Sequence, residues 1–135
     1  MSVRDRAFTG SPYEAQFGFA RAVRVGKRII VAGTGPVEDD GSSTRGGAAE
    51  QAERCCTLIV KALTQLGGCA DDVVRTRMFL TDPADQDAVG EVHARFFGAA
   101  SPAATMVGTA WLCRSEWKVE IEAEAIIQSG DQNPS

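Results

Sequence analysis

The chain has 135 residues and a formal net charge of −4, with 44% hydrophobic and 24% charged residues. This length suits one domain with a sizeable core, and the lack of a basic stripe argues against a nucleic-acid binder. The apolar runs are much shorter than the ~20 residues that a membrane-spanning helix needs. Because residues 1–6 lack the apolar segment of a signal peptide, the expected location is the cytoplasm.

The two ends of the chain are expected to differ from its middle. Residues 1–15 are polar and rich in turn-forming residues, which predicts an extended N-terminal arm. Residues 16–128 are expected to form a single domain, and 129–135 a flexible tail. The chain contains no internal repeat and no sign of a second domain.

A β-hairpin is predicted at the start of the domain. Residues 21–25 alternate weakly in polarity, and 28–32 are rich in β-branched residues. Between them, Gly26 stands at the first position of a two-residue turn, as a type II′ turn requires. The second strand ends at Gly33-Thr34-Gly35. Two glycines there allow a close approach by another backbone or a ligand, and a simple turn explains them equally well.

The spacing of apolar residues predicts a first helix at 48–66 that follows an acidic, glycine-rich loop. Cys55 and Cys56 lie on its apolar stripe, where small core residues are expected. Cys69 and Cys113 complete the four cysteines, and they form no CxxC pair. The sequence therefore predicts no metal ligand set, no cofactor and no catalytic thiol.

The second half of the chain alternates between strands and one more helix. Strands are predicted at 72–80 and 103–110, and a helix at 84–97. His93, the sole histidine, lies near the edge of this helix's apolar stripe. A packed or interface role is expected for it more than catalysis, which would need a partner group.

The last predicted strand, 118–127, has the clearest pattern in the chain. Its apolar residues point to one face, and Glu120, Glu122 and Glu124 point to the other. Carboxylates about 7 Å apart repel one another unless they are solvated, paired with bases or used in a site. Arg75 and Arg77 share one face of an earlier strand and are natural partners for the row. The alternative is that one glutamate faces a binding cleft.

The order of these elements predicts an α+β fold, in which two helices pack on one face of a mixed sheet. The other face retains enough apolar area to suggest that subunits associate through it.

Several segments, in their order and spacing, resemble the RidA/YjgF family of enamine and imine deaminases, some once called L-PSP endoribonucleases. The similar segments are 23–34, Glu50-Gln51, 72–82 and 119–123. The resemblance covers the chain from about Tyr13 to Ile127. It implies a chorismate-mutase-like fold and a homotrimer with a small-molecule cleft at each subunit interface.

The resemblance also implies a site. Glu120 corresponds to the glutamate thought to position the attacking water, and Tyr13, Gly33 and Thr34 correspond to substrate-binding positions. Ala104, however, stands where the family has the arginine that grips the substrate carboxylate. Losing such a contact costs roughly 2–5 kcal/mol.

Either another basic residue replaces this arginine or the ligand differs. The candidates are Arg21, Arg75, Arg77 and Arg114. Arg114 lies in the loop before the glutamate strand, and we take it as the candidate substrate-binding arginine.

Two functions follow from the sequence. The first is a divergent deaminase that hydrolyses C=N bonds with Glu120 and a water, with weak or absent activity on ordinary 2-imino acids. The second is a non-catalytic trimer that binds a small metabolite or serves regulation. A ribonuclease is disfavoured, because the chain is acidic and lacks a general acid–base pair.

Overall fold

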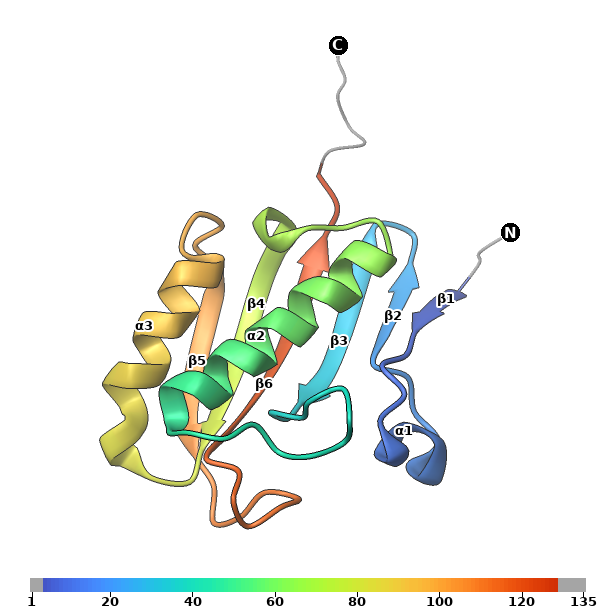
Figure 1. Cartoon of the computed structure of the whole chain (residues 1–135). Helices are drawn as coiled ribbons and strands as arrows, with labels where there is room; N and C mark the ends of the chain where they lie inside the picture. The colour runs from blue at the N-terminus through green and yellow to red at the C-terminus, as the bar shows by residue number, and fades with distance from the viewer. Residues whose placement is uncertain (1–3, 129–135) are drawn as a thin grey trace.

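In the computed structural model, which describes residues 4–128, six strands form one mixed sheet in the order β1-β2-β3-β6-β4-β5 (Figure 1). The strands are β1 Arg4–Ala7, β2 Ala22–Val25, β3 Arg28–Thr34, β4 Val73–Leu80, β5 Ala103–Gly108 and β6 Val119–Ile126. Neighbouring strands are antiparallel except β4 and β5, which are parallel. The strands predicted from the sequence are confirmed, and the flexible tail expected at 129–135 lies outside the described residues.

The hairpin of β2 and β3 turns at Gly26-Lys27, as predicted. Gly26 has a φ of +60°, a conformation that a primed turn needs and that glycine adopts without steric cost. Strand β3 then runs as far as Thr34, and its pairing with β6 shifts register between Val31 and Thr34. This irregularity lies beside the glycines that end the strand.

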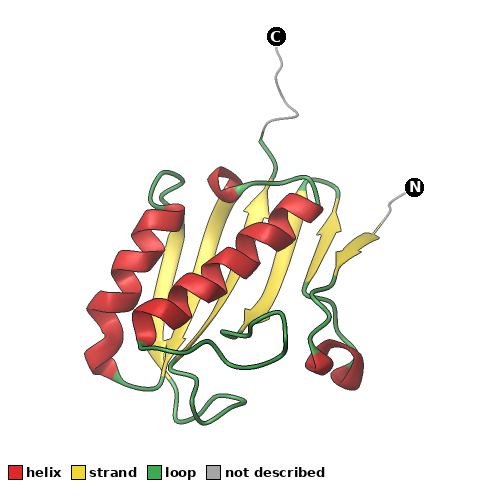
Figure 2. Cartoon of the chain, in the orientation of Figure 1, coloured by secondary structure: helices red, strands yellow, loops and turns green. Residues whose placement is uncertain are grey.

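Two helices, α2 (Ala48–Gln65) and α3 (Gln86–Phe97), cover one face of the sheet, as the sequence predicted (Figure 2). Glu50 caps the start of α2 by accepting a hydrogen bond from the backbone N–H of Gly47 at 2.9 Å. Short 3-10 turns lead into β4 and α3, namely η1 (Ala70–Asp72) and η2 (Pro83–Asp85). The second helix therefore begins as a 3-10 turn.

The core lies between these helices and the central strands. Val119, Ile121, Ala123 and Ala125 of β6 are at most 2% exposed, so the alternation read from the sequence does bury one face. Cys55 and Cys56 are buried in the same core, as expected from their place on α2.

The N-terminal segment differs from the extended arm that its polarity suggested. Residues 4–7 form edge strand β1, and Pro12–Phe17 form a short helix, α1. The side chain of Ser11 accepts a hydrogen bond from the backbone N–H of Tyr13, and Gly18 ends the helix with a φ of 78°. This helix has only six residues, which is too short for a helical spacing of apolar residues to be recognised, so the sequence pattern did not predict it.

The sheet face away from the helices carries both charged and apolar side chains. Val25, Ile30, Val107 and Ile126 lie there by register, and each is 42–44% exposed. None of the helices within residues 4–128 is long and apolar enough to cross a membrane.

Candidate functional site

Glu120 occupies the end of β6 near the N-terminal helix. It pairs with Phe79 of β4, and its side chain is partly buried. Burial raises the pKa of Glu120, the charge of Arg21 opposes this rise, and the charge of Glu122 adds to it. Within residues 4–128 the Glu120 carboxylate forms no ion pair, because Arg21 makes its close contacts elsewhere.

The glycines at the end of β3 make room for this side chain. A Cβ at Gly33 would lie 2.3 Å from Oε2 of Glu120, which is far inside van der Waals contact. A Cβ at Gly35 would similarly lie 2.4 Å from the Trp117 ring. The groups that approach these glycines closely are side chains of this same chain, whereas the sequence suggested another backbone, a ligand or a simple turn.

A buried ion pair holds α1 against the sheet. Nε of Arg21 lies 3.1 Å from Oε2 of Glu14, and the two side chains are only 7% and 3% exposed. Glu14 also accepts hydrogen bonds from the backbone N–H and the hydroxyl of Thr9. Arg21 donates to the backbone oxygen of Gly33 and to the Thr34 hydroxyl. The guanidinium of Arg21 therefore bonds to groups of this same chain, and these bonds hold α1 next to Glu120.

Tyr13 of α1 faces a cluster built by the loop before β6. Its hydroxyl accepts a hydrogen bond from Nε of Arg114 at 3.1 Å, and its ring meets Trp117 edge-on. Nη1 of Arg114 and the indole N–H of Trp117 both donate to the Ser43 hydroxyl at 3.0 Å. The Ser43 hydroxyl in turn donates to Glu116 at 2.7 Å. Residues more than 100 positions apart in the sequence, Tyr13 and Arg114, therefore meet here.

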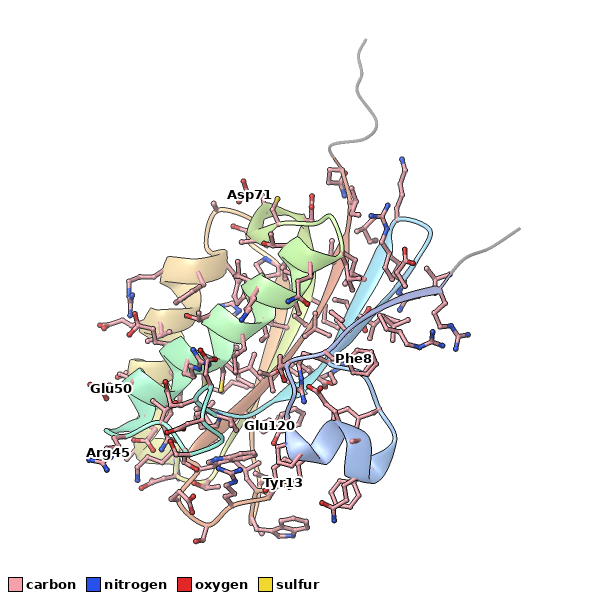
Figure 3. The ribbon with its side chains drawn as sticks, turned by 45° about the vertical axis from the view of Figure 1, so that its right-hand side comes forward. Phe8, Tyr13, Arg45, Glu50, Asp71 and Glu120 are labelled. Atoms are coloured by element: carbon pink, nitrogen blue, oxygen red, sulfur yellow. The ribbon has the colours of Figure 1, made fainter. Side chains whose placement is uncertain are left out.

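These groups enclose one pocket. Figure 3 shows Tyr13 and Glu120 near each other beside α1, and both line a cavity of about 100 Å³. Gly33 and Thr34 also line the cavity, so four of the five residues predicted for the site border the same space. The fifth, Arg114, is bonded to the Tyr13 hydroxyl. What each of them does remains a prediction.

The rest of the glutamate row is engaged in ion pairs on the open sheet face. Glu122 lies 3.4 Å from Arg77, one of the two partners expected for the row. Glu124 pairs instead with Arg28 at 3.1 Å, although Arg75 is its register partner on β4. The expectation that Arg75 would hold a glutamate is therefore not met, because the hairpin strand supplies a closer guanidinium.

Ala104, at the position where the resemblance implies an arginine, lies away from Glu120 within one chain. It pairs with Thr76 and so belongs to the helix-covered side of the sheet, at the exposed edge strand β5. Glu120 projects from the opposite face. A side chain at residue 104 can approach a Glu120 carboxylate only if that carboxylate belongs to another subunit.

Sequence reasoning missed several pocket residues. Phe19 was not singled out as a pocket residue, nor was Glu14 as the ion-pair partner of the pocket residue Arg21. Trp117 was assigned to the core, where it is indeed 4% exposed while also lining the pocket. Cys113 was placed in a connecting turn, and it borders the cavity as well. One available signal was the polar Glu14 followed seven residues later by Arg21, but Glu14 lies in α1 and Arg21 lies after that helix ends, so no single helix or strand links them.

The other reactive side chains lie elsewhere. His93 is part of α3, its Nε2 lies 2.8 Å from the Thr76 hydroxyl of β4, and burial lowers the pKa of His93. Burial raises the pKa of Cys56 to about 12, which disfavours its thiolate. No group of three or more potential metal ligands comes together within residues 4–128.

Comparison with known proteins extends over almost the whole chain. A family model described as Endoribonuclease L-PSP matches residues 9–127. An uncharacterized protein of Streptomyces coelicolor is 38% identical over 89% of this chain and 90% of its own length. A protein of Mus musculus named 2-iminobutanoate/2-iminopropanoate deaminase is 30% identical over 80% of each chain.

Comparison with solved structures indicates the same family. A member of the YjgF/YER057c/UK114 family from Mycobacterium tuberculosis has a TM-score of 0.83 and 39% identity, covering 93% of this chain and 100% of that chain. Its fold is the mixed sheet with two covering helices described above. The chain therefore belongs to the endoribonuclease L-PSP family, which is the RidA/YjgF family that its sequence resembles.

Proposed function

We propose that the pocket hydrolyses the C=N bond of a small imine or of the imine tautomer of an enamine. Glu120 holds the water that attacks the imine carbon. One observation carries this proposal: Glu120 is a partly buried carboxylate without an ion pair in the described chain, and it lines a pocket with Tyr13 and Thr34. A carboxylate that neighbours an arginine but is not neutralised by it is available to accept a proton.

The reaction balances without a cofactor. Water adds to the carbon of R₂C=NH, and Glu120 accepts the proton that the water loses. Glu120 returns this proton to the nitrogen, which gives the carbinolamine R₂C(OH)NH₂. Glu120 then takes the hydroxyl proton and passes it to the nitrogen as the C–N bond breaks, so that a ketone and ammonia leave. Burial raises the pKa of Glu120, so its ionised form is a better base than an exposed glutamate. General base catalysis of this kind typically contributes ~10²–10⁴-fold.

Family membership supports the same chemistry. The Mus musculus relative is named for the deamination of 2-iminobutanoate and 2-iminopropanoate, and it is 30% identical to this chain. Glu120 also lies on β6 within residues 119–123, one of the segments in which the sequence resembles the family.

We propose that the working unit is a cytoplasmic homotrimer with cyclic symmetry and clefts between subunits. Two observations support a cleft completed by a second copy. The cavity of about 100 Å³ in one chain is smaller than the ~300–1,000 Å³ of most ligand sites. The open sheet face also exposes apolar side chains such as Ile30.

Light scattering tests this assembly. The expected mass is three times the 14.3 kDa of one chain. Ile30→Lys, which places a charge on the open face, should yield a lower mass, whereas Thr57→Lys on the exposed side of α2 should not. A monomer at micromolar concentration for the unmodified protein would contradict the trimer.

A second candidate is a trimer that binds a metabolite without reacting with it. The observation in its favour is Ala104, which removes the family's carboxylate grip, together with the buried pairing of Arg21 with Glu14. On this alternative, ligands bind in the cleft and the substitution of Glu120 changes no rate.

Two glutamine variants separate the candidates. Imines generated in situ from amino acids by an amino-acid oxidase are offered to each protein, and ammonia release above the spontaneous rate is measured. Glu120→Gln should lower this rate by about 100-fold or more. The control Glu124→Gln removes a carboxylate of the same strand that pairs with Arg28, and it should retain activity. Equal rates for the two variants would remove Glu120 from the mechanism.

A further inference from the structure

We propose that Trp117 is a specificity-determining residue, which limits the substrate of this pocket to imines with a short apolar substituent on the imine carbon. Imines whose substituent carries an aromatic ring are then excluded. The assignment of imines as the substrate rests on the proposed hydrolysis. The size limit rests on the packing of Trp117, and it applies to any ligand that enters the pocket.

The lining of the pocket favours an apolar substituent. Its apolar side chains come from α1, from α2 and from the loops near them, and they are Tyr13, Phe17, Phe19, Val37, Leu58, Cys113 and Trp117. Apart from Glu120, the polar lining side chains are already hydrogen-bonded within the chain, and they are Thr9, Ser11, Arg21 and Thr34. A polar substituent would gain few new hydrogen bonds here, whereas an apolar one leaves water without that cost.

The volume that one chain encloses suits a substituent and not a whole substrate. The cavity measures about 100 Å³. An apolar cavity that binds benzene measures about 150 Å³. A phenyl ring therefore enters this cavity only if a wall moves, while a short aliphatic group fits without such a change.

Trp117 takes up the space that a side chain at residue 35 would fill. A Cβ at Gly35 would lie 2.4 Å from Cη2 of the indole and 2.5 Å from its Cζ3. The matching contact at Gly33 is with the Glu120 carboxylate. Residues two apart in extended backbone are separated by about 7 Å. The indole therefore lies on the order of 7 Å from the carboxylate, where it meets the far end of a short substituent.

The indole is held in this place by several contacts. Its N–H donates to the Ser43 hydroxyl at 3.0 Å, and Trp117 is only 4% exposed. Its ring meets that of Tyr13 edge-on, with 6.2 Å between the ring centres. The guanidinium carbon of Arg114 lies 5.5 Å from the centre of the indole. A ligand that is too large must break these contacts to enter, which is why a fixed ring discriminates by size.

The other apolar walls are less suited to limit size. Phe17 is 63% exposed, so it can turn toward solvent. Val37 and Leu58 also line a second cavity of about 60 Å³ beside α1, so they have free space behind them. Trp117 lies between Gly35 and the Ser43 hydroxyl, and its displacement costs a hydrogen bond. We therefore assign the size limit to Trp117.

The test compares two substrates within each protein, so that a general loss of activity cancels. Imines are generated in situ from L-norvaline, which gives a propyl substituent, and from L-phenylalanine, which gives a benzyl substituent. The kcat/KM for ammonia release is measured on the full-length protein, and the unmodified protein should favour the propyl imine. Trp117→Leu should raise the relative kcat/KM of the benzyl imine about 10- to 100-fold, within the range by which apolar pockets discriminate substituents of different size.

Two variants control for folding and for the loss of a tryptophan. Trp111→Leu is the matched control, because Trp111 precedes Trp117 in the same loop, is 73% exposed and, in the described chain, lies outside the pocket lining. It should keep the preference of the unmodified protein. Trp117→Phe retains an aromatic ring in case Trp117→Leu does not fold, and its preference should be intermediate. Equal preferences in the variants of Trp117 and Trp111, or equal kcat/KM of the unmodified protein for both imines, would overturn the proposal.

A double variant tests the packing of the indole against Gly35. Gly35→Ala alone should lower kcat/KM for both imines, because its methyl group would lie 2.4 Å from the indole and force the ring to move. Added to Trp117→Leu, the same change refills part of the opened space. It should therefore restore part of the preference for the propyl imine. If the double variant were as permissive as Trp117→Leu, the opened space would lie elsewhere and Trp117 would not be the limiting wall.

The binding of neutral ketones separates the size limit from the proposed reaction. The probes are 2-pentanone, which carries the propyl group, and phenylacetone, which carries the benzyl group, and NMR titration measures their Kd. Trp117→Leu should lower the ratio of the phenylacetone Kd to the 2-pentanone Kd about 10- to 100-fold. If this ratio shifts while no protein hydrolyses imines, the reaction is wrong and the size limit stands. If imines are hydrolysed but neither ratio responds to Trp117, the size limit is wrong and the reaction stands. If no ketone binds and no imine is hydrolysed, both proposals fail.

Discussion

The two ends of β6 carry the same residue type in the same alternation and yet differ in their surroundings. At one end Glu122 and Glu124 lie on the open sheet face, each beside an arginine. At the other end Glu120 lies in a pocket under α1, where burial raises its pKa. The difference comes from neighbouring segments and not from the strand. Helix α1 covers one end only, and Gly33 leaves room for a carboxylate at that end alone.

The largest expected effect tests what holds α1 over the pocket. Arg21→Met would leave Glu14 buried without its ion-pair partner, which typically costs about 3–5 kcal/mol. The matched control is Arg95→Met, because Arg95 and Glu53 form an exposed pair with side chains 60% and 53% accessible, where a cost of about 0–1 kcal/mol is expected. Chemical denaturation measures both. Similar costs for the two variants would mean that the buried pair is not what fixes α1.

The next prediction tests the space that Gly33 provides. Gly33→Ala would place a methyl group 2.3 Å from the present position of Glu120 Oε2, so the carboxylate must move. Displacement by about 1 Å can cost on the order of 10²-fold in rate, and we expect imine hydrolysis to fall by about 10- to 100-fold. Gly90→Ala in α3 is the control, since its methyl group would meet only the end of Met106 at 4.0 Å. Alanine within a helix should also stabilise that variant slightly.

A smaller effect is expected from the titration of Glu120. Its pKa in the folded protein is raised from 4.5 by burial, so folding favours the protonated form. The stabilising contribution of Glu120 is therefore fully present below the unfolded pKa and is lost as pH rises through the folded pKa. Glu120→Gln should be more stable than the unmodified protein at pH 7, and this advantage should shrink as the pH falls through the raised folded pKa and be lost below the unfolded value of 4.5. Thermal unfolding across pH 3–8, with Glu124→Gln as the comparison, measures this difference.

The sequence predicted the architecture well because the two-residue alternation of the strands and the helical spacing of apolar residues were both clear. The alternation of Glu120, Glu122 and Glu124 placed one face of β6 in the core, and the stripe through Cys55 and Cys56 placed α2 on the sheet. The family resemblance then pointed to Glu120. What sequence could not supply was the neighbourhood of that residue. The contacts of Tyr13 with Arg114, and of Arg21 with Gly33, join segments whose separation in the chain follows no local period.

The ion-pair partners of the glutamate row could likewise be predicted only in part from the sequence. The two arginines on β4 were natural partners for the glutamate row from their shared face, and Arg77 does hold Glu122. Glu124 pairs instead with Arg28 of β3, because β3 is the other strand that neighbours β6 in the sheet. Choosing between two flanking strands requires the strand order, which short-range patterns do not contain.

The smallest expected effect concerns Cys113, which borders the pocket although it was predicted to be non-catalytic. A thiol acts as a nucleophile through its thiolate, which needs a base or a cation in contact with the sulfur. Within the described chain the Cys113 thiol has no hydrogen-bond partner, and the sole histidine belongs to α3, where it is hydrogen-bonded to Thr76. Cys113→Ala should therefore change the rate of imine hydrolysis by less than about threefold, within the range of a packing change at a pocket wall. A loss as large as that of Glu120→Gln, in a protein whose unfolding transition is unchanged, would give the thiol the role that we assign to the carboxylate. The hydrolytic mechanism would then have to be replaced by a covalent one.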